Sequence, residues 1–172
     1  IEQQAGLLLM LEQNGALSRV IVETEQQAGW LLISRGDTTA SGPSLAPDGH
    51  AVAYTSQQNQ GQIIVAPLTV TTIITATDRQ IIFAEDIGKV DKSGDLTNLA
   101  LCPWSGTAWS SDSKRLAFFA CNKAPFSVVL VADLSTGSPS LKIVRDSQHN
   151  TDFERDLSWL NAQQLTISTP AD

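Results

Sequence analysis

The residues that could perform chemistry in this chain are few and far apart. Its two histidines, His50 and His149, have no serine and aspartate partners at the spacing of a catalytic triad. The sequence also lacks the G-x-S-x-G motif that presents the nucleophile of α/β-hydrolases. We therefore expect a protein that is not an enzyme and binds no cofactor, with His50 as a solvated turn residue.

One segment could hold a metal ion. Asp91, Ser93 and Asp95 offer oxygen ligands at alternate positions, as a calcium-binding loop does. The segment departs from that loop in two ways, because its glycine stands at the fourth position rather than the sixth and no glutamate stands at the twelfth. These three residues are the calcium candidate of the sequence, and a polar loop is the interpretation that we favour.

The two cysteines, Cys102 and Cys121, could form a disulfide. They lie on either side of a predicted turn at Ser111-Asp112, and a hairpin centred there places them opposite each other on antiparallel strands. A disulfide needs Cα atoms within about 7 Å, which such a pair provides. The bond would indicate an oxidising compartment. The alternative is two buried free thiols.

The composition indicates a folded, exported protein. A chain of 172 residues can bury a core without metals, and no apolar run in it reaches the roughly 20 residues that span a bilayer. The net charge is −7 and the 11 basic residues are scattered, so nucleic acid is not an expected partner. Frequent Gln, Thr and Ser with scarce Lys and Glu favour a periplasmic or extracellular location. Because the chain begins at Ile1, we expect a removed leader or a piece of a longer protein.

The elements that must position these residues form a repeat, first visible at Leu45–Ser56. Ser44-Leu45-Ala46 reads as a short strand, Pro47-Asp48-Gly49 as a turn, and His50–Ser56 as the returning strand. The same order recurs at 107–120 and in shortened form at 157–169. Two runs rich in β-branched residues follow each of the first two copies, at 62–68 and 71–77, and at 126–133 and 140–145.

A four-strand repeat of about 40 to 50 residues is typical of β-propeller blades. We therefore predict an all-β fold of four-stranded antiparallel blades, in one domain over 1–172. Its parts are a partial blade at 6–34, a blade at 42–77, an insertion at 78–104 with one extra strand at 80–84, a blade at 105–147 and a half blade at 155–169. A propeller closes with about four to eight blades. We therefore expect an incomplete propeller or part of a larger one, with open strand edges; residues 157–169 pairing with the N-terminal strands is an alternative.

Two stretches, PSLAPDGHAVAYTS at 43–56 and TAWSSDSKRLAFFA at 107–120, resemble the WD40-like (PD40) repeat of the TolB type. That pattern is an aromatic or apolar residue, Ser-Pro-Asp-Gly, a basic residue and a short strand. The first copy keeps Pro47-Asp48-Gly49 but has Leu45 for Trp, the second keeps Trp109-Ser110, and the third keeps Ser158-Trp159. The resemblance implies a β-propeller. Such repeats occur in periplasmic Tol-system proteins and in the propeller domains of prolyl-oligopeptidase-type enzymes.

Alternation along the predicted strands indicates which side chains form the core between blades. Trp109 and Trp159 should wedge between neighbouring blades near the turns, since a buried Trp brings a large apolar area. The other residues expected to face adjacent blades are Val52, Tyr54, Ile64, Leu116, Phe118, Val129 and Leu130.

Two functions are compatible with these predictions. The first is a non-catalytic, exported protein-interaction scaffold in a larger complex, which binds protein partners through open strand edges or the 78–104 insertion. The alternative is the non-catalytic propeller domain of a larger prolyl-oligopeptidase-type hydrolase. Because fold does not determine function, a G-x-S-x-G motif elsewhere in the reading frame would be needed to favour the second.

Overall fold

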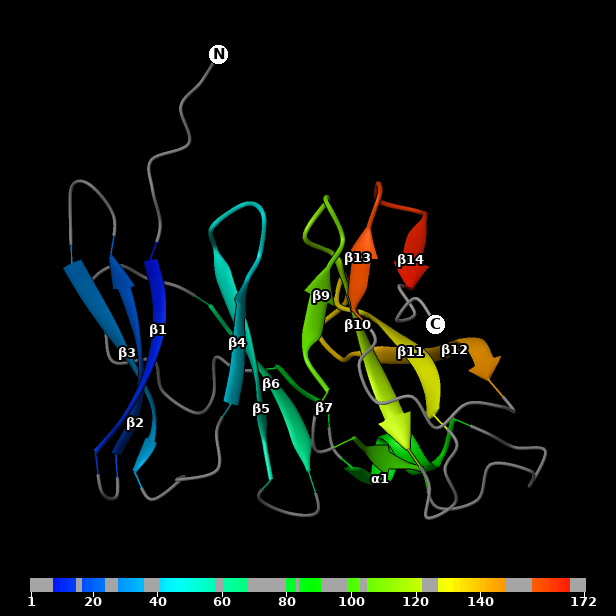
Figure 1. The fold of residues 1–172 in the computed structure, drawn as a ribbon, viewed down its shortest axis with the longest axis horizontal. Helices are drawn as coiled ribbons and strands as arrows, with labels where there is room; N and C mark the ends of the chain where they lie inside the picture. Colours follow the sequence, from blue (N-terminus) through cyan, green and yellow to red (C-terminus); the bar gives the residue numbers. More distant parts are fainter. Residues whose placement is uncertain are drawn as a thin grey trace, which may run out of the picture.

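The computed structural model describes residues 8–14, 17–23, 28–35, 41–57, 61–67, 80–82, 84–90, 99–102, 105–121, 127–147 and 156–167. These residues form antiparallel sheets with one short helix, and the sheets stand side by side in chain order (Figure 1). The fold is therefore all-β, as the sequence predicts. Within the described ranges, no helix is long and apolar enough to cross a membrane.

The first sheet contains three strands, β1 (Leu8–Asn14), β2 (Leu17–Glu23) and β3 (Ala28–Arg35), in the order β1-β2-β3. They correspond to the hairpin and third strand expected of the N-terminal partial blade. Strand β1 lies beside β4 of the next sheet, so the first sheet flanks the second (Figure 1).

The second sheet is a four-stranded blade. Its strands, in spatial order, are β4 (Ser41–Leu45), β5 (Ala51–Ser56), β6 (Gln62–Pro67) and β7 (Gln80–Ile82). The fourth strand thus comes from the segment that we assigned to the insertion, and the expected 71–77 strand lies outside the described residues. In β7, Ile82 pairs with Ile63 and is 1% exposed. Burial of the apolar Ile82 side chain is more favourable than its exposure to water, which favours the pairing of β7 with β6.

The rest of the insertion also packs into the core. Helix α1 (Ala84–Gly88) begins where we expected the extra strand to end, and strand β8 (Ala100–Leu101) was not anticipated. Two acidic residues in the first turn of α1 complement the positive end of the helix dipole. Ile87 of α1 is fully buried in the same cluster as Leu101. The described part of the insertion is therefore largely structural.

The third sheet is the second complete blade. It contains β9 (Thr107–Trp109), β10 (Arg115–Cys121), β11 (Ser127–Asp133) and β12 (Ser140–Ser147). Strand β11 pairs with one edge of β10, while β9 and β8 share the other edge. Apart from β8, these are the strands that the repeat predicts.

A final hairpin, β13 (Leu157–Trp159) and β14 (Leu165–Ile167), begins the third copy of the repeat. It forms a two-stranded sheet of its own and lies far from β1–β3 (Figure 1). In the described part of the chain, the alternative of a blade shared with the N-terminal strands is therefore not formed.

The turns of the three copies share one hydrogen bond. In each, an Asx side chain accepts a hydrogen bond from the backbone N–H two residues later, which stabilises the turn. The bonds join Asp48 to His50 at 2.9 Å, Asp112 to Lys114 at 3.2 Å and Asn161 to Gln163 at 2.8 Å. The third copy therefore keeps an Asx bond, but its turn is one residue shorter, because the Leu160 N–H donates to the Gln164 carbonyl four residues later whereas the Ser110 N–H donates to the Arg115 carbonyl five residues later.

The position after the turn aspartate adopts a left-handed backbone in both complete blades. Gly49 has a φ of 74° and its counterpart Ser113 a φ of 57°. Glycine takes this conformation without strain, as the sequence predicts for Gly49. At Ser113 the side chain compensates in part, because its Oγ accepts a hydrogen bond from the Asp48 N–H of the neighbouring turn at 3.1 Å.

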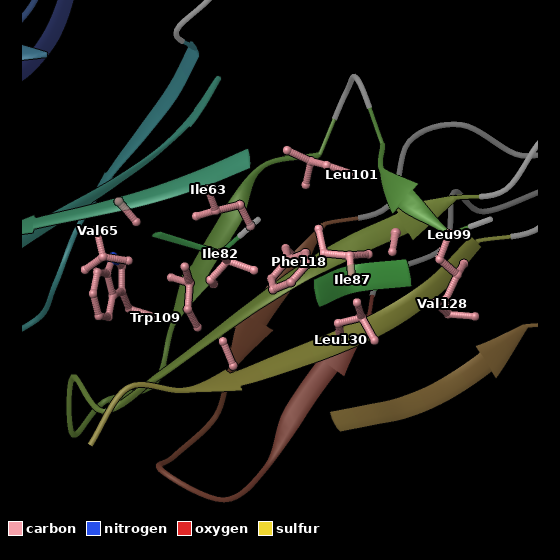
Figure 2. Packing of buried hydrophobic residues seen from close by; sticks show 14 of the residues in the cluster. Ile63, Val65, Ile82, Ile87, Leu99, Leu101, Trp109, Phe118, Val128 and Leu130 are labelled. Carbon is pink, nitrogen blue, oxygen red and sulfur yellow. The ribbon is translucent and has the colours of Figure 1, made fainter. Parts of the chain in front are cut away.

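The main core lies between the second and third sheets (Figure 2). The second sheet contributes Ile63, Val65 and Ile82, and the third contributes Phe118 and Leu130 among others. The opposite face of the second sheet, which the first sheet flanks, carries Val52, Tyr54 and Ile64, with exposed fractions of 0%, 0% and 5%. Both faces of this blade are therefore buried, as stacking of blades requires.

Candidate functional site

The structure places the residues considered for chemistry as follows. His50 lies in an exposed turn, with its Nδ1 3.7 Å from Asp48 Oδ1. His149 and the calcium candidates Asp91, Ser93 and Asp95 lie outside the described residues. Where the structure does describe the chain, no group of three or more His, Cys, Asp and Glu side chains is close enough together to hold a metal ion. The features left for a site are the contacts between blades and the surface of the last hairpin.

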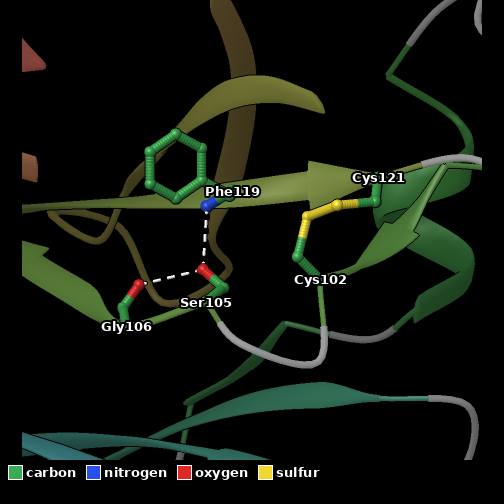
Figure 3. Close-up of a disulfide and its surroundings, with 5 residues drawn as sticks. All are labelled: Cys102, Ser105, Gly106, Phe119 and Cys121. Atoms are coloured by element: carbon green, nitrogen blue, oxygen red, sulfur yellow. Dashed lines mark hydrogen bonds between the residues drawn. A yellow bond between two sulfur atoms is a disulfide. The ribbon is translucent and has the colours of Figure 1, made fainter. Parts of the chain in front are cut away.

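Cys102 and Cys121 form a disulfide, with their Cα atoms 5.1 Å apart (Figure 3). We expected the two residues directly opposite each other. They lie diagonally across the two strands instead. Strand β8 pairs Ala100 with Cys121, and the Cys102 N–H donates to the Phe119 carbonyl at 3.2 Å. The difference arises because β8 and β9 pair with β10 in different registers, so one hairpin axis does not describe both.

Ser105 lies at the point where β10 changes partner from β8 to β9. Its buried Oγ accepts a hydrogen bond from the Phe119 N–H at 2.9 Å and donates to the Gly106 carbonyl at 2.9 Å (Figure 3). The Ser105 hydroxyl therefore accepts the Phe119 N–H at the point where β10 changes from one neighbouring strand to the other. The sequence contains no signal for this role, because the need for Ser105 arises only from the change of register.

The same tryptophan hydrogen bond joins successive blades. Trp109 Nε1 donates to the Ser44 carbonyl at 3.2 Å, and Trp159 Nε1 donates to the Ala108 carbonyl at 3.0 Å. Ser44 and Ala108 occupy equivalent places in the repeat, one residue before Leu45 and Trp109. The two tryptophans therefore set the spacing of the second sheet, the third sheet and the last hairpin. Leu45 stands at the equivalent position of the first copy, and its aliphatic side chain has no donor with which to make this bond.

The two tryptophans differ in burial. Trp109 is 9% exposed, whereas Trp159 is only partly buried. The Arg115 guanidinium lies over the Trp159 ring, 6.0 Å from its centroid, in a cation–π arrangement. Trp159 therefore belongs both to the contact between blades and to an open surface.

That surface is a groove of about 620 Å³ between the third sheet and the last hairpin. Its lining mixes aliphatic and charged side chains, and Val144 within it is 47% exposed. The third sheet contributes Arg115, Val131, Asp133, Ser140, Lys142 and Val144, and the hairpin contributes Trp159, Gln163, Leu165 and Ile167.

Two carboxylates, Asp112 and Asp133, lie near the Arg115 charge beside the groove. The pKa of Asp112 is lowered, mainly because the Ser110 hydroxyl donates a hydrogen bond to Asp112 Oδ1 at 2.6 Å. Burial raises this pKa, whereas the Lys114 N–H and the Arg115 charge lower it further. Arg115 Nη2 lies 3.5 Å from Asp112 Oδ2. The Ser135 hydroxyl and N–H likewise lower the pKa of Asp133. Both carboxylates are thus ionised and offset the Arg115 charge.

Comparison with known proteins supports the fold. No family model matches the sequence, and no curated protein matches it significantly. Among solved structures, the chain is similar to TolB from Acinetobacter baumannii, with a TM-score of 0.57 and 14% sequence identity. The match covers 89% of this chain and 33% of the TolB chain, so this chain spans about a third of that protein's length. At this identity the similarity shows the fold alone, which is that of TolB-like β-propeller blades.

Proposed function

We propose that this chain is a non-enzymatic protein-interaction module of an exported complex, and that its contact surface is the groove beside β14. The observation that carries the proposal is the open side of the last hairpin. In the described residues, the second sheet has four strands and the third has five, whereas β13–β14 has two. The groove is therefore the face of the third sheet that the two-stranded hairpin covers only in part.

The chemistry of the groove is that of a protein-binding surface. Interface centres are rich in aromatic residues and Arg, and groups of exposed aliphatic side chains commonly mark contact sites. The groove combines Trp159 and Arg115 with aliphatic Val131 and Val144. In the described part of the 78–104 insertion, by contrast, Ile82, Ile87, Leu99 and Leu101 are buried in the core.

The disulfide and the TolB-like fold support the exported location. Disulfides persist in oxidising compartments such as the periplasm and are rare in the cytosol. The Cys102–Cys121 bond fits such a compartment.

Photo-cross-linking in the source organism tests this function. A photoreactive amino acid replaces Gln163, which is exposed and lines the groove, or Glu85, which is exposed on α1. We expect a discrete cross-linked product, of a mass above the 18.4 kDa chain, from position 163 and not from position 85. A product from position 85 alone would move the contact to the insertion, and no product from either position would contradict the proposal.

A further inference from the structure

The two ends of the disulfide differ in accessibility. Cys102 is 1% exposed and packs with Phe119 and Val129. Its backbone is also held, because its N–H donates to the Phe119 carbonyl at 3.2 Å and its carbonyl accepts the Ser105 N–H at 2.9 Å. Cys121 is partly exposed at the end of β10 (Figure 3). A reagent in solution can therefore approach Cys121, whereas it reaches Cys102 only when the structure opens.

The exposure of Cys121 belongs to its place in the blade. The turn residues Asp48 and Asp112 align the two complete blades, so Gln57 of the second sheet is the counterpart of Cys121 in the third. Packing of the third sheet against the second buries Ala53 completely, yet it leaves Gln57 exposed. This position therefore extends beyond the contact between blades, and access to Cys121 does not require an open groove.

Thiol–disulfide chemistry is sensitive to this difference. A disulfide forms or breaks when a thiolate attacks a disulfide sulfur and produces a mixed disulfide, so the rate depends on access to the reacting sulfur. The apolar surroundings of Cys102 also disfavour a charged thiolate, which is the reactive form. The second step is intramolecular, and the separation of 5.1 Å between the two Cα atoms compensates for the small thiolate fraction of Cys102.

We propose that Cys121 is the cysteine through which this chain forms a mixed disulfide with a disulfide oxidant, and that Cys102 resolves it. The Cys121 thiolate attacks one sulfur of the oxidant, and the other sulfur of the oxidant leaves as a thiolate. The Cys102 thiolate then attacks the Cys121 sulfur, and the bond from Cys121 to the oxidant breaks. The two cysteine thiols are thereby oxidised to one disulfide, while the oxidant takes up their electrons and protons and becomes two thiols. The inference goes beyond the proposed function, because it holds whether or not the groove binds a partner.

The probe is glutathione disulfide, and the readout is the mass of the full chain followed by peptide mapping. C102A leaves Cys121 as the single thiol and C121A leaves Cys102, so the two variants lack the same cross-link and serve as matched controls. The folded C102A variant should form the adduct at least about tenfold faster than the folded C121A variant, since a buried group reacts only on local opening. Equal rates in the folded variants, or faster reaction of C121A, would overturn the inference.

Unfolding provides the control for access. In urea above the unfolding midpoint both variants should form the adduct at similar rates, because both thiols are then in water. A tenfold difference that persisted in urea would arise from neighbours in the sequence rather than from burial, and it would also overturn the inference.

The oxidised wild-type chain gives a second test that needs no variant to fold. Its reduction passes through the same mixed disulfide in reverse, so reduced glutathione should attack the Cys121 sulfur and release the Cys102 thiol. After rapid alkylation of free thiols, peptide mapping should place the glutathione on Cys121 and the alkyl group on Cys102. Glutathione found mainly on Cys102 would refute the assignment.

Discussion

Removal of the Cys102–Cys121 disulfide should destabilise the folded chain by about 3 kcal/mol. The bond joins residues separated by 19 positions. Closing a loop of that length lowers the entropy of the unfolded chain by about 11 cal/mol/K, which is about 3 kcal/mol at 298 K. The folded state changes little, because Cys102 is 1% exposed and packs with Phe119 and Val129, an apolar site that accepts alanine.

The assay is urea unfolding followed by tryptophan fluorescence, for the oxidised protein and the double variant with alanine at both cysteines. With an m-value of about 2 kcal/mol/M, the midpoint should fall by about 1.5 M. Each single alanine variant should show nearly the same loss as the double variant, since either change removes the whole cross-link. C102S should cost more than C102A, because it places a hydroxyl in the apolar cluster.

Two results would refute this reasoning. The first is an oxidised protein whose urea midpoint does not change when a reductant is added, since the loop-entropy argument requires a loss. The second is alkylation of two cysteines in the unreduced protein, which would show free thiols in place of the disulfide.

Three further predictions concern single side chains. S105A should lower the free energy of unfolding by about 1 to 3 kcal/mol, measured by urea unfolding, because it removes the buried hydroxyl that accepts the Phe119 N–H; a loss below about 0.5 kcal/mol would contradict this. W109F should cost at least about 1 to 2 kcal/mol in the same assay, since a smaller phenyl ring replaces the indole and the Ser44 carbonyl loses its donor, and a neutral result would argue against the bond between blades. Because the pKa of Asp112 is lowered in the folded state, this carboxylate stabilises the fold above about pH 4, which is near its unfolded pKa. That stability is lost as the pH falls through the folded pKa. D112N should therefore be less stable than the wild type at pH 7, and the difference in urea midpoint should shrink toward pH 2; a constant difference would contradict the charge argument.

Local patterns were sufficient to predict the strands and turns of the blades. Alternating apolar residues predict β5 and β10, because one face of a strand must be buried whatever packs on it. The turn at Asp48-Gly49 follows from residue chemistry within four positions. The sequence also pairs the two cysteines, although it expects them on one hairpin, whereas Cys102 follows β8 and only β9 is joined to β10 by the turn. These features depend on short separations along the chain.

Features that depend on packing between distant segments were missed. The sequence predicts a fourth strand at 71–77, yet β7 takes the place beside β6 because Ile82 completes the core there. The same cluster draws in α1 and β8, since Ile87 and Leu101 have no other apolar site to occupy. Nothing local distinguishes these apolar residues from those of an exposed insertion.

The amino-acid sequence by itself determined that the chain forms antiparallel blades, and where their turns and disulfide lie, because alternation and turn chemistry act over a few residues. The tertiary structure decided the register change that makes Ser105 necessary, the tryptophan bonds that space the blades, and the groove beside β14. The register change lies within the third sheet, where β8 and β9 both pair with β10. The tryptophan bonds and the groove arise where two blades meet. Packing between segments about 50 or more residues apart sets such contacts, and no local pattern encodes it.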